Sequence, residues 1–247
     1  VLYICGLGYS NVLVNGKKVG SNHLVTAPWT ANERLVGFSA LDITPNLQLN
    51  QKNTITVMLG NGWRDQSDFK SNDPNELQGD TTAKVLRAQL RLSARDTKPV
   101  TFTGDGTWKA TAGPSTYDSV YNGETFNATT MLHLFDTTIQ QWQPAHILTK
   151  NNAPRGKMIP WSAPPVEITK EIQPISVSSP EPHIYVYDFG VNVAGVVRLN
   201  QIENFKKNEI IVMRHGEIMQ HSGIPGLNHS NPNFIYTANL RSAKATD

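Results

Sequence analysis

The chain has 247 residues, 38% of them hydrophobic, and carries a formal net charge of +2. This composition is sufficient to bury a core and excludes a disordered chain, and no run of about 18 apolar residues predicts a transmembrane helix. Its 22 lysines and arginines are scattered along the sequence, which argues against nucleic acid and membrane surfaces as partners.

Alternation of apolar and polar residues predicts strands along the first half of the chain. The segment Val1–Cys5 opens it, and its cysteine is expected to be a buried, unreactive thiol. Asn15-Gly16 between two apolar runs predicts a hairpin with a type I′ turn. Further strands are expected at residues 54–59, 84–93, 100–103 and 108–110, whereas a helical turn is suggested at residues 137–142. These patterns predict an all-β fold.

A proline-rich segment divides the chain. Proline fixes φ and cannot donate to a strand ladder, so residues 153–183 are predicted to form an extended connector with an edge strand. Two β-sandwich domains are expected on either side, over residues 1–152 and 184–247. Strand patterns resume in the second at residues 184–189, 195–199 and 209–213. Because the sequence opens inside a strand-like run, it is interpreted as a piece of a longer protein.

Most motifs that carry chemistry are missing from the sequence. It has no nucleophile elbow, phosphate loop, HExxH or CxxC motif, and its histidines lack the spacing of metal ligands. Arg214–Glu217 resembles a catalytic corner, but a strand end with a solvated ion pair is the plainer interpretation. Glycoside hydrolysis needs two carboxylates across a cleft, and the sequence alone does not pair its acidic residues in that way.

Oxygen ligands are dense between Arg64 and Asp80. Ca²⁺ binds roughly six to eight oxygens from carboxylates, amides and backbone carbonyls. The candidate calcium ligands in this loop are Asp73, Asn75, Glu76 and Asp80. A solvated surface loop is the alternative, because the spacing lacks the full EF-hand pattern.

Several motifs occur in the order found in one enzyme family. GLGYSNVLVNGKKVG, APWT, LGNGW and YNGETFNA follow one another first, and YVYDFGVNVAGVVRL, RHGEIM and NLRSAKATD come later. Together they resemble the N-terminal β-sandwich domains of bacterial α-L-rhamnosidases, glycoside hydrolase family 78, over nearly the whole chain. The resemblance implies a jelly-roll, galactose-binding-like first sandwich and an incomplete second one.

That resemblance also implies a function for the parent protein. Family members hydrolyse terminal α-L-rhamnosides with inversion, using an acid and a base in an (α/α)₆ barrel that follows these domains, and some bind L-rhamnose on the first sandwich with help from calcium. Nothing here resembles the barrel, so no catalytic residue is expected in this chain. Its expected partners are the barrel of the same parent and a rhamnose-containing glycan. A free-standing lectin and a purely structural scaffold are the alternatives.

Trp63 in LGNGW is the residue on which a sugar site would depend. A sugar needs a flat apolar surface and fixed amide or carboxylate groups, which Trp63, Asn61 and Glu124 would supply. Gly60 and Gly62 are expected to adopt positive φ and to bend the strand end outward. The alternative is that Trp63 caps the core and Asn61 only forms the turn.

Two further polar residues, Asp188 and Asn192, flank glycine in YDFGVNVAG. Such residues commonly bond to their own backbone, so local hydrogen bonds are the first interpretation and ligand contact the second. The other tryptophans, at positions 29, 108, 142 and 161, are expected to pack in the core or between domains.

Overall fold

The computed structural model describes residues 1–20, 23–25, 30–63, 84–93, 97–119, 123–132, 134, 142–148, 153–200 and 210–216. The elements they form are mostly strands, which confirms the predicted all-β class at this level. Contacts divide the chain into two compact units, residues 1–112 with 135–167 and residues 113–134 with 168–247. The predicted domain limits at residues 152 and 183 stay predictions.

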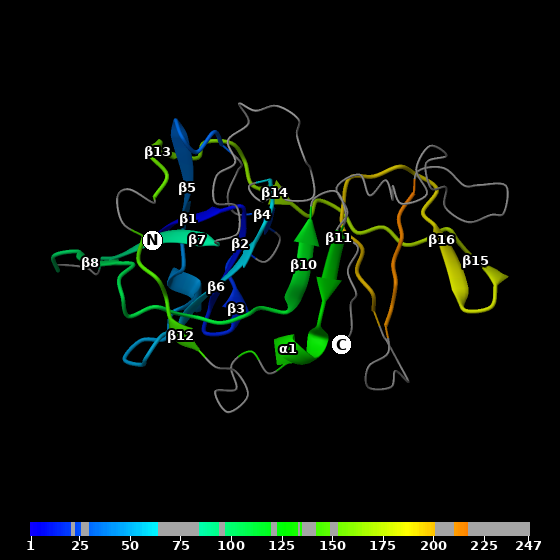
Figure 1. The fold of residues 1–247 in the computed structure, drawn as a ribbon, viewed down its shortest axis with the longest axis horizontal. Coiled ribbons are helices and arrows are strands. Elements are labelled where there is room, and N and C mark those ends of the chain that lie inside the picture. Colours follow the sequence, from blue (N-terminus) through cyan, green and yellow to red (C-terminus); the bar gives the residue numbers. More distant parts are fainter. Residues whose placement is uncertain are drawn as a thin grey trace. The chain divides into compact units, whose positions relative to one another are not determined.

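Five strands form the larger sheet of the first unit (Figure 1). β1 (Leu2–Leu7) lies at its centre between β5 (Leu35–Leu41) and β7 (Val85–Leu92), and its edges are β13 (Lys157–Pro160) and β8 (Val100–Thr103). β13 runs parallel to β5, whereas the other pairings are antiparallel. The proline-rich segment thus supplies an edge strand, as predicted, since proline is tolerated at a sheet edge.

A three-stranded sheet contains the predicted hairpin. β2 (Tyr9–Val14) lies between β3 (Lys17–Lys18) and β6 (Ile55–Gly60). Asn15 and Gly16 connect β2 to β3 with φ of +52° and +77°. Positive φ at both central residues is the requirement of a type I′ turn, and the prediction from Asn-Gly is confirmed.

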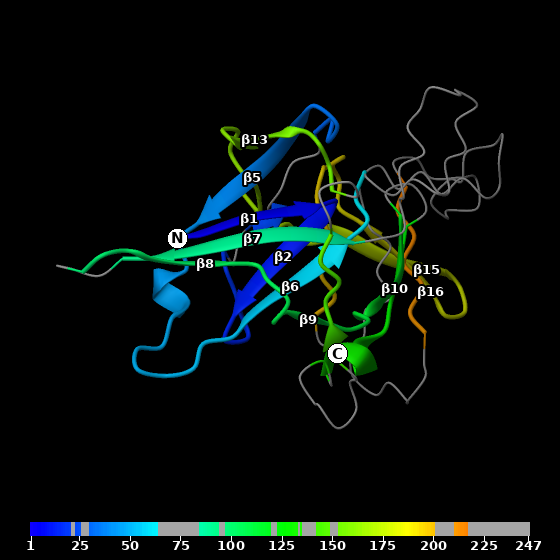
Figure 2. The same cartoon turned by 60° about the vertical axis from the view of Figure 1, so that its left-hand side comes forward.

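The two sheets share a hydrophobic core, and Figure 2 shows β1 and β7 beside β2 and β6. Leu2 and Ile4 of β1 meet Val12 and Val14 of β2, and all four are almost completely buried. Trp108 packs against this core, as predicted. Because successive side chains of a strand point to opposite faces, β1 also sends side chains to the outer face of its sheet.

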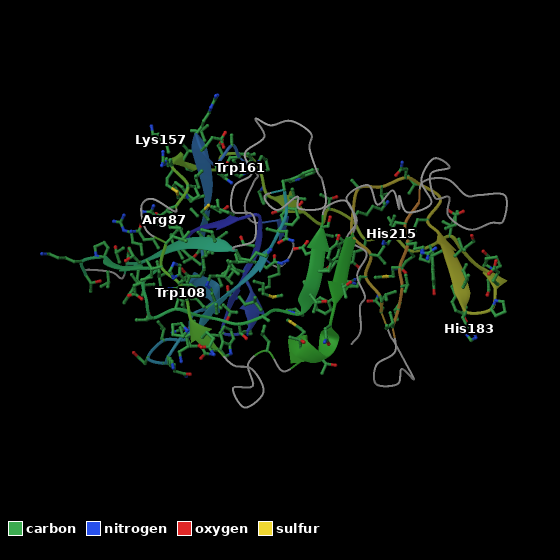
Figure 3. All side chains as sticks on the ribbon, viewed as in Figure 1. Arg87, Trp108, Lys157, Trp161, His183 and His215 are labelled. Atoms are coloured by element: carbon green, nitrogen blue, oxygen red, sulfur yellow. The ribbon has the colours of Figure 1, made fainter. Side chains whose placement is uncertain are left out.

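Cys5 lies on that outer face, in a second cluster with Leu7 and Val36. It is a free thiol with 4% of its surface exposed, as predicted. Burial raises the pKa of the Cys5 thiol, and the Arg87 guanidinium (labelled in Figure 3) lowers it by less. The raised pKa reduces the fraction of thiolate, and burial reduces the access of reagents to the sulfur.

We therefore expect iodoacetamide at pH 8 to alkylate Cys5 in the native chain about a hundredfold more slowly than in urea, since reaction needs local opening. Mass spectrometry of the quenched reaction measures both rates. Equal rates in the native and unfolded chain would contradict the buried position. A short peptide containing one cysteine serves as the control for reagent activity in urea.

Shorter pairings complete the described part of the first unit. β4 (His23–Val25) pairs with β14 (Val166–Glu167), and β9 (Lys109–Ala110) pairs with β12 (Gln143–Pro144). A 3₁₀-helix, η1, covers Thr44–Asn46. The strands predicted at residues 54–59, 84–93, 100–103 and 108–110 are confirmed within one or two residues at each end.

The second unit contains two hairpins and a short helix in its described part. β10 (Ser115–Ser119) pairs with β11 (Gly123–Phe126), and β15 (Ser176–Glu181) pairs with β16 (Ile184–Asp188). The helix α1 (Ala128–Leu132) was not predicted. Asn127 begins it, because its Oδ1 accepts a hydrogen bond of 3.3 Å from the backbone N–H of Thr130.

Three predicted elements have a different outcome. Residues 195–199 and 210–213 form no strand, so these two predictions are wrong for the residues that the structure describes. A strand needs ladder hydrogen bonds to a neighbour, and neither segment belongs to a sheet formed by the described residues. The helical turn suggested at residues 137–142 falls outside the described residues except for Trp142, which is not helical.

Candidate functional site

The segment 60–63, Gly-Asn-Gly-Trp, lies against the turn between β1 and β2. Tyr9 pairs with Gly60 at the end of β6, and Gly8 in the turn has φ of +94°. A Cβ atom on Gly8 would lie 2.4 Å from the carbonyl oxygens of both Gly60 and Asn61. No side chain fits there, so direct backbone contact fixes the point from which Asn61 and Trp63 project.

Gly62 adopts the positive φ predicted for it, +54°. The same prediction for Gly60 is wrong, because Gly60 is the last residue of β6 and keeps its ladder position opposite Tyr9. The left-handed residue that turns the chain is therefore Gly62. A Cβ on Gly62 would lie 3.1 Å from the backbone of Gly8, so the two glycines also allow this close approach.

Asn61 and Trp63 are both half-buried. The Oδ1 atom of Asn61 is shielded from solvent. Trp108 packs against the main core cluster, whereas Trp63 lies outside both clusters formed by the described residues. Trp63 is therefore neither a core residue nor fully exposed, and stacking on a sugar ring would require its exposed part to include the indole.

Glu124 lies in the second unit, on β11. It is half-buried, and its Oε1 accepts a short hydrogen bond from the hydroxyl of Ser115. Directly opposite in the ladder is Asp118, of which 9% is exposed. Asp118 was not among the predicted site residues. One signal for it was present in the sequence: two residues of a hairpin that are equally far from the middle of the connection face each other, and Asp118 and Glu124 are equally far from it.

The Asp118–Glu124 pair does not have the surroundings of a glycosidase acid and base. Like charges directly opposite in a ladder destabilise it unless other groups compensate, and both residues have further interactions. Hydrolysis requires two carboxylates that reach one substrate, whereas Asp118 is buried and Glu124 is bound by Ser115. We assign no catalysis to this pair.

The four predicted calcium ligands, Asp73, Asn75, Glu76 and Asp80, lie outside the described residues. Within the part of the chain that the structure describes, no group of three or more His, Cys, Asp or Glu side chains is arranged to hold a metal ion. The calcium site stays a prediction.

Asp188 bonds to its own backbone, which confirms the first interpretation for this residue; for Asn192 it stays a prediction. Its Oδ1 accepts a hydrogen bond of 2.7 Å from the N–H of Gly190, and Gly190 has φ of +69°. The arrangement is an Asx-type turn that follows β16. Asn192 is exposed beyond it.

The predicted corner at residues 214–217 is described up to Gly216. Arg214 is exposed, whereas His215, labelled in Figure 3, is half-buried. Its Nε2 atom is buried and has no hydrogen-bond partner among the described residues, and burial lowers the pKa of the imidazole. His215 is thus kept neutral near pH 7, and the solvated ion pair with Glu217 falls outside the described residues.

Two tryptophans differ in exposure. Trp142 is half-buried, whereas Trp161 is 39% exposed beside the edge strand β13 (Figure 3), so Trp161 is not a core residue among the described residues, and its packing between domains stays a prediction. The indole of Trp161 offers a second accessible aromatic surface in the first unit. No helix among the described residues is long and apolar enough to cross a membrane.

The sequence matches two family profiles. Residues 1–170 match the α-L-rhamnosidase N-terminal domain, and residues 178–247 match the concanavalin-like domain of bacterial α-L-rhamnosidases. Among curated proteins, an α-L-rhamnosidase of Formosa agariphila is 32% identical over 85% of this chain, and one of Streptomyces avermitilis is 28% identical over 100% of it. The chain spans 22% of the length of each.

Solved structures show the same relation. An α-L-rhamnosidase from Dictyoglumus thermophilum has a TM-score of 0.72 at 26% identity, over 95% of this chain and 25% of its own. The Streptomyces avermitilis enzyme, complexed with L-rhamnose, has a TM-score of 0.67 at 22% identity and shares the fold over 91% of this chain. That match covers 21% of the Streptomyces chain.

Proposed function

The chain belongs to the α-L-rhamnosidase family through its N-terminal domain, and from this premise we propose that it is the non-catalytic N-terminal portion of a longer α-L-rhamnosidase. The parent enzyme would hydrolyse terminal α-L-rhamnosides with inversion, in an (α/α)₆ barrel beyond this chain. One observation supports this proposal. The family matches cover residues 1–170 and 178–247 of the chain, yet the chain spans only 22% of the length of the two relatives from Formosa agariphila and Streptomyces avermitilis.

The finer architecture belongs to the same proposal. The first domain would be a jelly-roll, galactose-binding-like sandwich, built on the five-stranded and three-stranded sheets that share a core. The second would be an incomplete sandwich, to which the β15–β16 hairpin contributes. Backbone contact at Gly8 would then make the end of β6 a rigid support for Asn61 and Trp63.

We further propose that the first domain binds terminal L-rhamnose through Trp63 and Asn61. The accessible part of the indole would stack on the C–H face of the ring, and the amide of Asn61 would bond a hydroxyl. L-rhamnose is the ligand named for the Streptomyces avermitilis structure. Glu124 lies in the other unit and already accepts from Ser115, so it is a separate candidate acceptor that needs its own variant.

Calcium is a proposed aid to this binding. Asp73, Asn75, Glu76 and Asp80 follow Trp63 by 10 to 17 positions in the sequence, and their hard oxygens suit Ca²⁺. A metal ion there would supply a fixed positive charge for sugar hydroxyls. The measurable consequence is that a chelator would weaken sugar binding.

A structural scaffold is the second candidate function. The observation that favours it is the half-buried state of Trp63, which leaves less than the whole indole face for a sugar. In that case the two domains would brace the barrel and contact no glycan. A free-standing lectin is the remaining alternative, and it would bind sugar with no need of a barrel.

Titration of L-rhamnose into the purified chain, followed by tryptophan fluorescence, tests the sugar proposal. We expect saturable quenching that is reduced by EDTA and abolished in Trp63→Ala. Trp161→Ala is the matched control, because this indole is at least as exposed but lies beside β13; it should keep the response. No quenching from a folded chain, with or without calcium, would exclude the site and favour the scaffold.

The same preparation should not hydrolyse p-nitrophenyl α-L-rhamnoside, since hydrolysis needs a carboxylate pair that this chain is not expected to hold. Turnover above that of a mock purification would contradict the proposed non-catalytic role, whatever the outcome of the sugar titration.

A further inference from the structure

The outer face of the five-stranded sheet changes from apolar to polar along its length. At one end it carries the apolar cluster that contains Cys5. Toward the other end, the exposed side chains of β7 are Arg87, Gln89 and Arg91. Residues two positions apart in a strand share a face, and Arg87 lies directly opposite Cys5 in the ladder, so all three belong to the outer face. Their guanidinium and amide groups offer hydrogen-bond donors to a ligand.

The neighbouring strands β1 and β8 extend this row into a surface (Figure 2). Tyr3 of β1 and Thr103 of β8 both lie opposite Gln89, and Thr101 lies opposite Arg91. Both threonines are exposed, and Tyr3 is half-buried. We call the following residues the polar face: Tyr3, Arg87, Gln89, Arg91, Thr101 and Thr103. They come from three adjacent strands of one sheet within the first unit.

An aromatic contact holds Tyr3 in place. Its ring packs edge to face with that of Phe38 on β5, with the centroids 6.1 Å apart and an angle of 72° between the planes. Phe38 in turn packs against the apolar cluster of Cys5, Leu7 and Val36. Because β1 is paired on both sides, the exposed area of Tyr3 comes chiefly from its side chain. A supported and partly exposed ring of this kind can stack on the C–H face of a sugar.

The positive charge of the polar face is not neutralised by the described part of the first unit. Neither Arg87 nor Arg91 has an ion-pair partner among the residues that the structure describes. Asp42 and Asp105, which follow β5 and β8, each accept a backbone N–H bond of 2.9 Å within their own turn. No described carboxylate of this unit lies on β1, β7 or β8; they are Glu33, Asp42, Asp105 and Glu167. The polar face therefore attracts a negatively charged ligand.

The spacing of the two guanidiniums fits a polymeric ligand. Arg87 and Arg91 are four positions apart, so their Cα atoms lie about 13 Å apart along β7, which favours a ligand with several charged units over a single sugar. Guanidinium binds carboxylate and similar oxyanions through paired N–H groups, and Gln89, Thr101 and Thr103 offer polar groups for sugar hydroxyls. Nucleic acid fits less well, because its binding depends on the neutralisation of many phosphates.

We propose that the polar face binds an acidic polysaccharide, with Arg87 and Arg91 pairing with its carboxylate or sulfate groups and Tyr3 stacking on one of its rings. The choice of a glycan as the ligand rests on the proposed function, in which the chain belongs to an enzyme that acts on glycans. The site is separate from that of Trp63, which follows β6 in the other sheet of this unit. It requires no rhamnose in the ligand.

Biolayer interferometry with the immobilised 247-residue chain tests the proposal. The probes are polygalacturonate, which carries carboxylates, dextran sulfate, which carries sulfates, and dextran, which is the neutral control. We expect at least one of the two acidic polymers to bind at low salt and dextran not to bind. The affinity should fall at least about tenfold at high salt, because ions screen exposed charges. The acidic polymer that binds identifies the anionic group.

Variants assign the binding to the polar face. Arg87→Gln with Arg91→Gln should weaken it at least about tenfold, since two charge-assisted contacts are lost. Lys17→Gln with Lys52→Gln is the matched control, because it removes the same charge from exposed positions on or beside the three-stranded sheet; it should keep the binding. Tyr3→Leu should weaken the binding several-fold, whereas Tyr3→Phe, which keeps a ring, should retain it. Urea unfolding shows that each variant is folded.

Four results would overturn the proposal. They are no binding of either acidic polymer, binding that the arginine pair does not affect, binding that Tyr3→Leu leaves unchanged, and equal, arginine-dependent binding of poly-L-glutamate or duplex DNA. The last two would leave a surface that attracts anions without recognising a sugar. Rhamnose quenching at Trp63 is a separate readout, because none of these polymers contains rhamnose, so the two proposals fail separately.

Discussion

Replacement of Gly8 by alanine is expected to disrupt the first unit more than any other substitution considered. The new Cβ would lie 2.4 Å from two backbone carbonyl oxygens, and the φ of +94° is itself unfavourable for an L-residue. Neither oxygen belongs to a flexible side chain, so the strand end of β6 must move away from the turn. We expect the free energy of unfolding to fall by at least about 4 kcal/mol, which lowers Tm by roughly 10 °C.

Urea unfolding followed by tryptophan fluorescence measures this loss, and Gly16→Ala is its control. Gly16 also has positive φ, +77°, but a Cβ there meets nothing within 4 Å. Gly16→Ala should therefore lower the free energy of unfolding only by the cost of alanine at positive φ, about 1 kcal/mol. Equal destabilisation by both substitutions would show that the contact between the β1–β2 turn and Asn61 is not tight.

The Gly8 variant also tests the support of the candidate sugar site. If Gly8 fixes the end of β6, a folded population of Gly8→Ala at low temperature should lose rhamnose quenching, whereas Gly16→Ala should keep it. The site would then depend on a residue that touches no ligand, because the backbone of Gly8 positions Asn61 and Trp63.

Asn15→Ala is expected to lower the free energy of unfolding by about 3 to 4 kcal/mol, the second largest effect. The Nδ2 group of Asn15 donates to the carbonyl of Asn46 at 2.9 Å and to Oδ1 of Asn53 at 2.8 Å. Its Oδ1 accepts from the N–H of Thr54 at 2.9 Å. Each such bond contributes about 1 kcal/mol net, and alanine is also disfavoured at the φ of +52°.

Two variants separate these contributions. Asn15→Gly relieves the unfavourable φ but still loses all three hydrogen bonds, so it should retain most of the loss. Asn50 has a similar φ of +59° on an exposed loop, and Asn50→Ala should lose about 1 kcal/mol from conformation alone. The midpoints of urea unfolding measure the stability of all three variants. An Asn15→Gly chain as stable as the unchanged one would contradict a role for the hydrogen bonds.

Local sequence signals predicted the strands whose partners lie nearby. The Asn15-Gly16 turn sets the register of β2 and β3 by its own backbone preference, and residues 84–93 form β7 because one side of the alternation faces the core. These features depend on residues close in sequence or on burial of one face. For that reason they could be predicted without knowledge of the topology.

Features that depend on distant partners were missed or wrong. Gly60 stays extended because Tyr9 pairs with it across the sheet, and Gly8, not Gly60, allows the close approach. Residues 195–199 have the composition of a strand but join none of the sheets formed by the described residues. Asp118 was missed because its burial and its position opposite Glu124 follow from the ladder of β10 and β11. Register and partner choice are tertiary properties.

The parallel pairing of β13 with β5 has a consequence for biosynthesis. β5 ends at Leu41, whereas β13 begins at Lys157, after residues 113–134 of the other unit have been made. During translation the ribosome therefore releases β5 long before the strand that covers its outer edge. An uncovered edge recruits strands from other molecules, so nascent chains shorter than about 160 residues should be the species that need a chaperone.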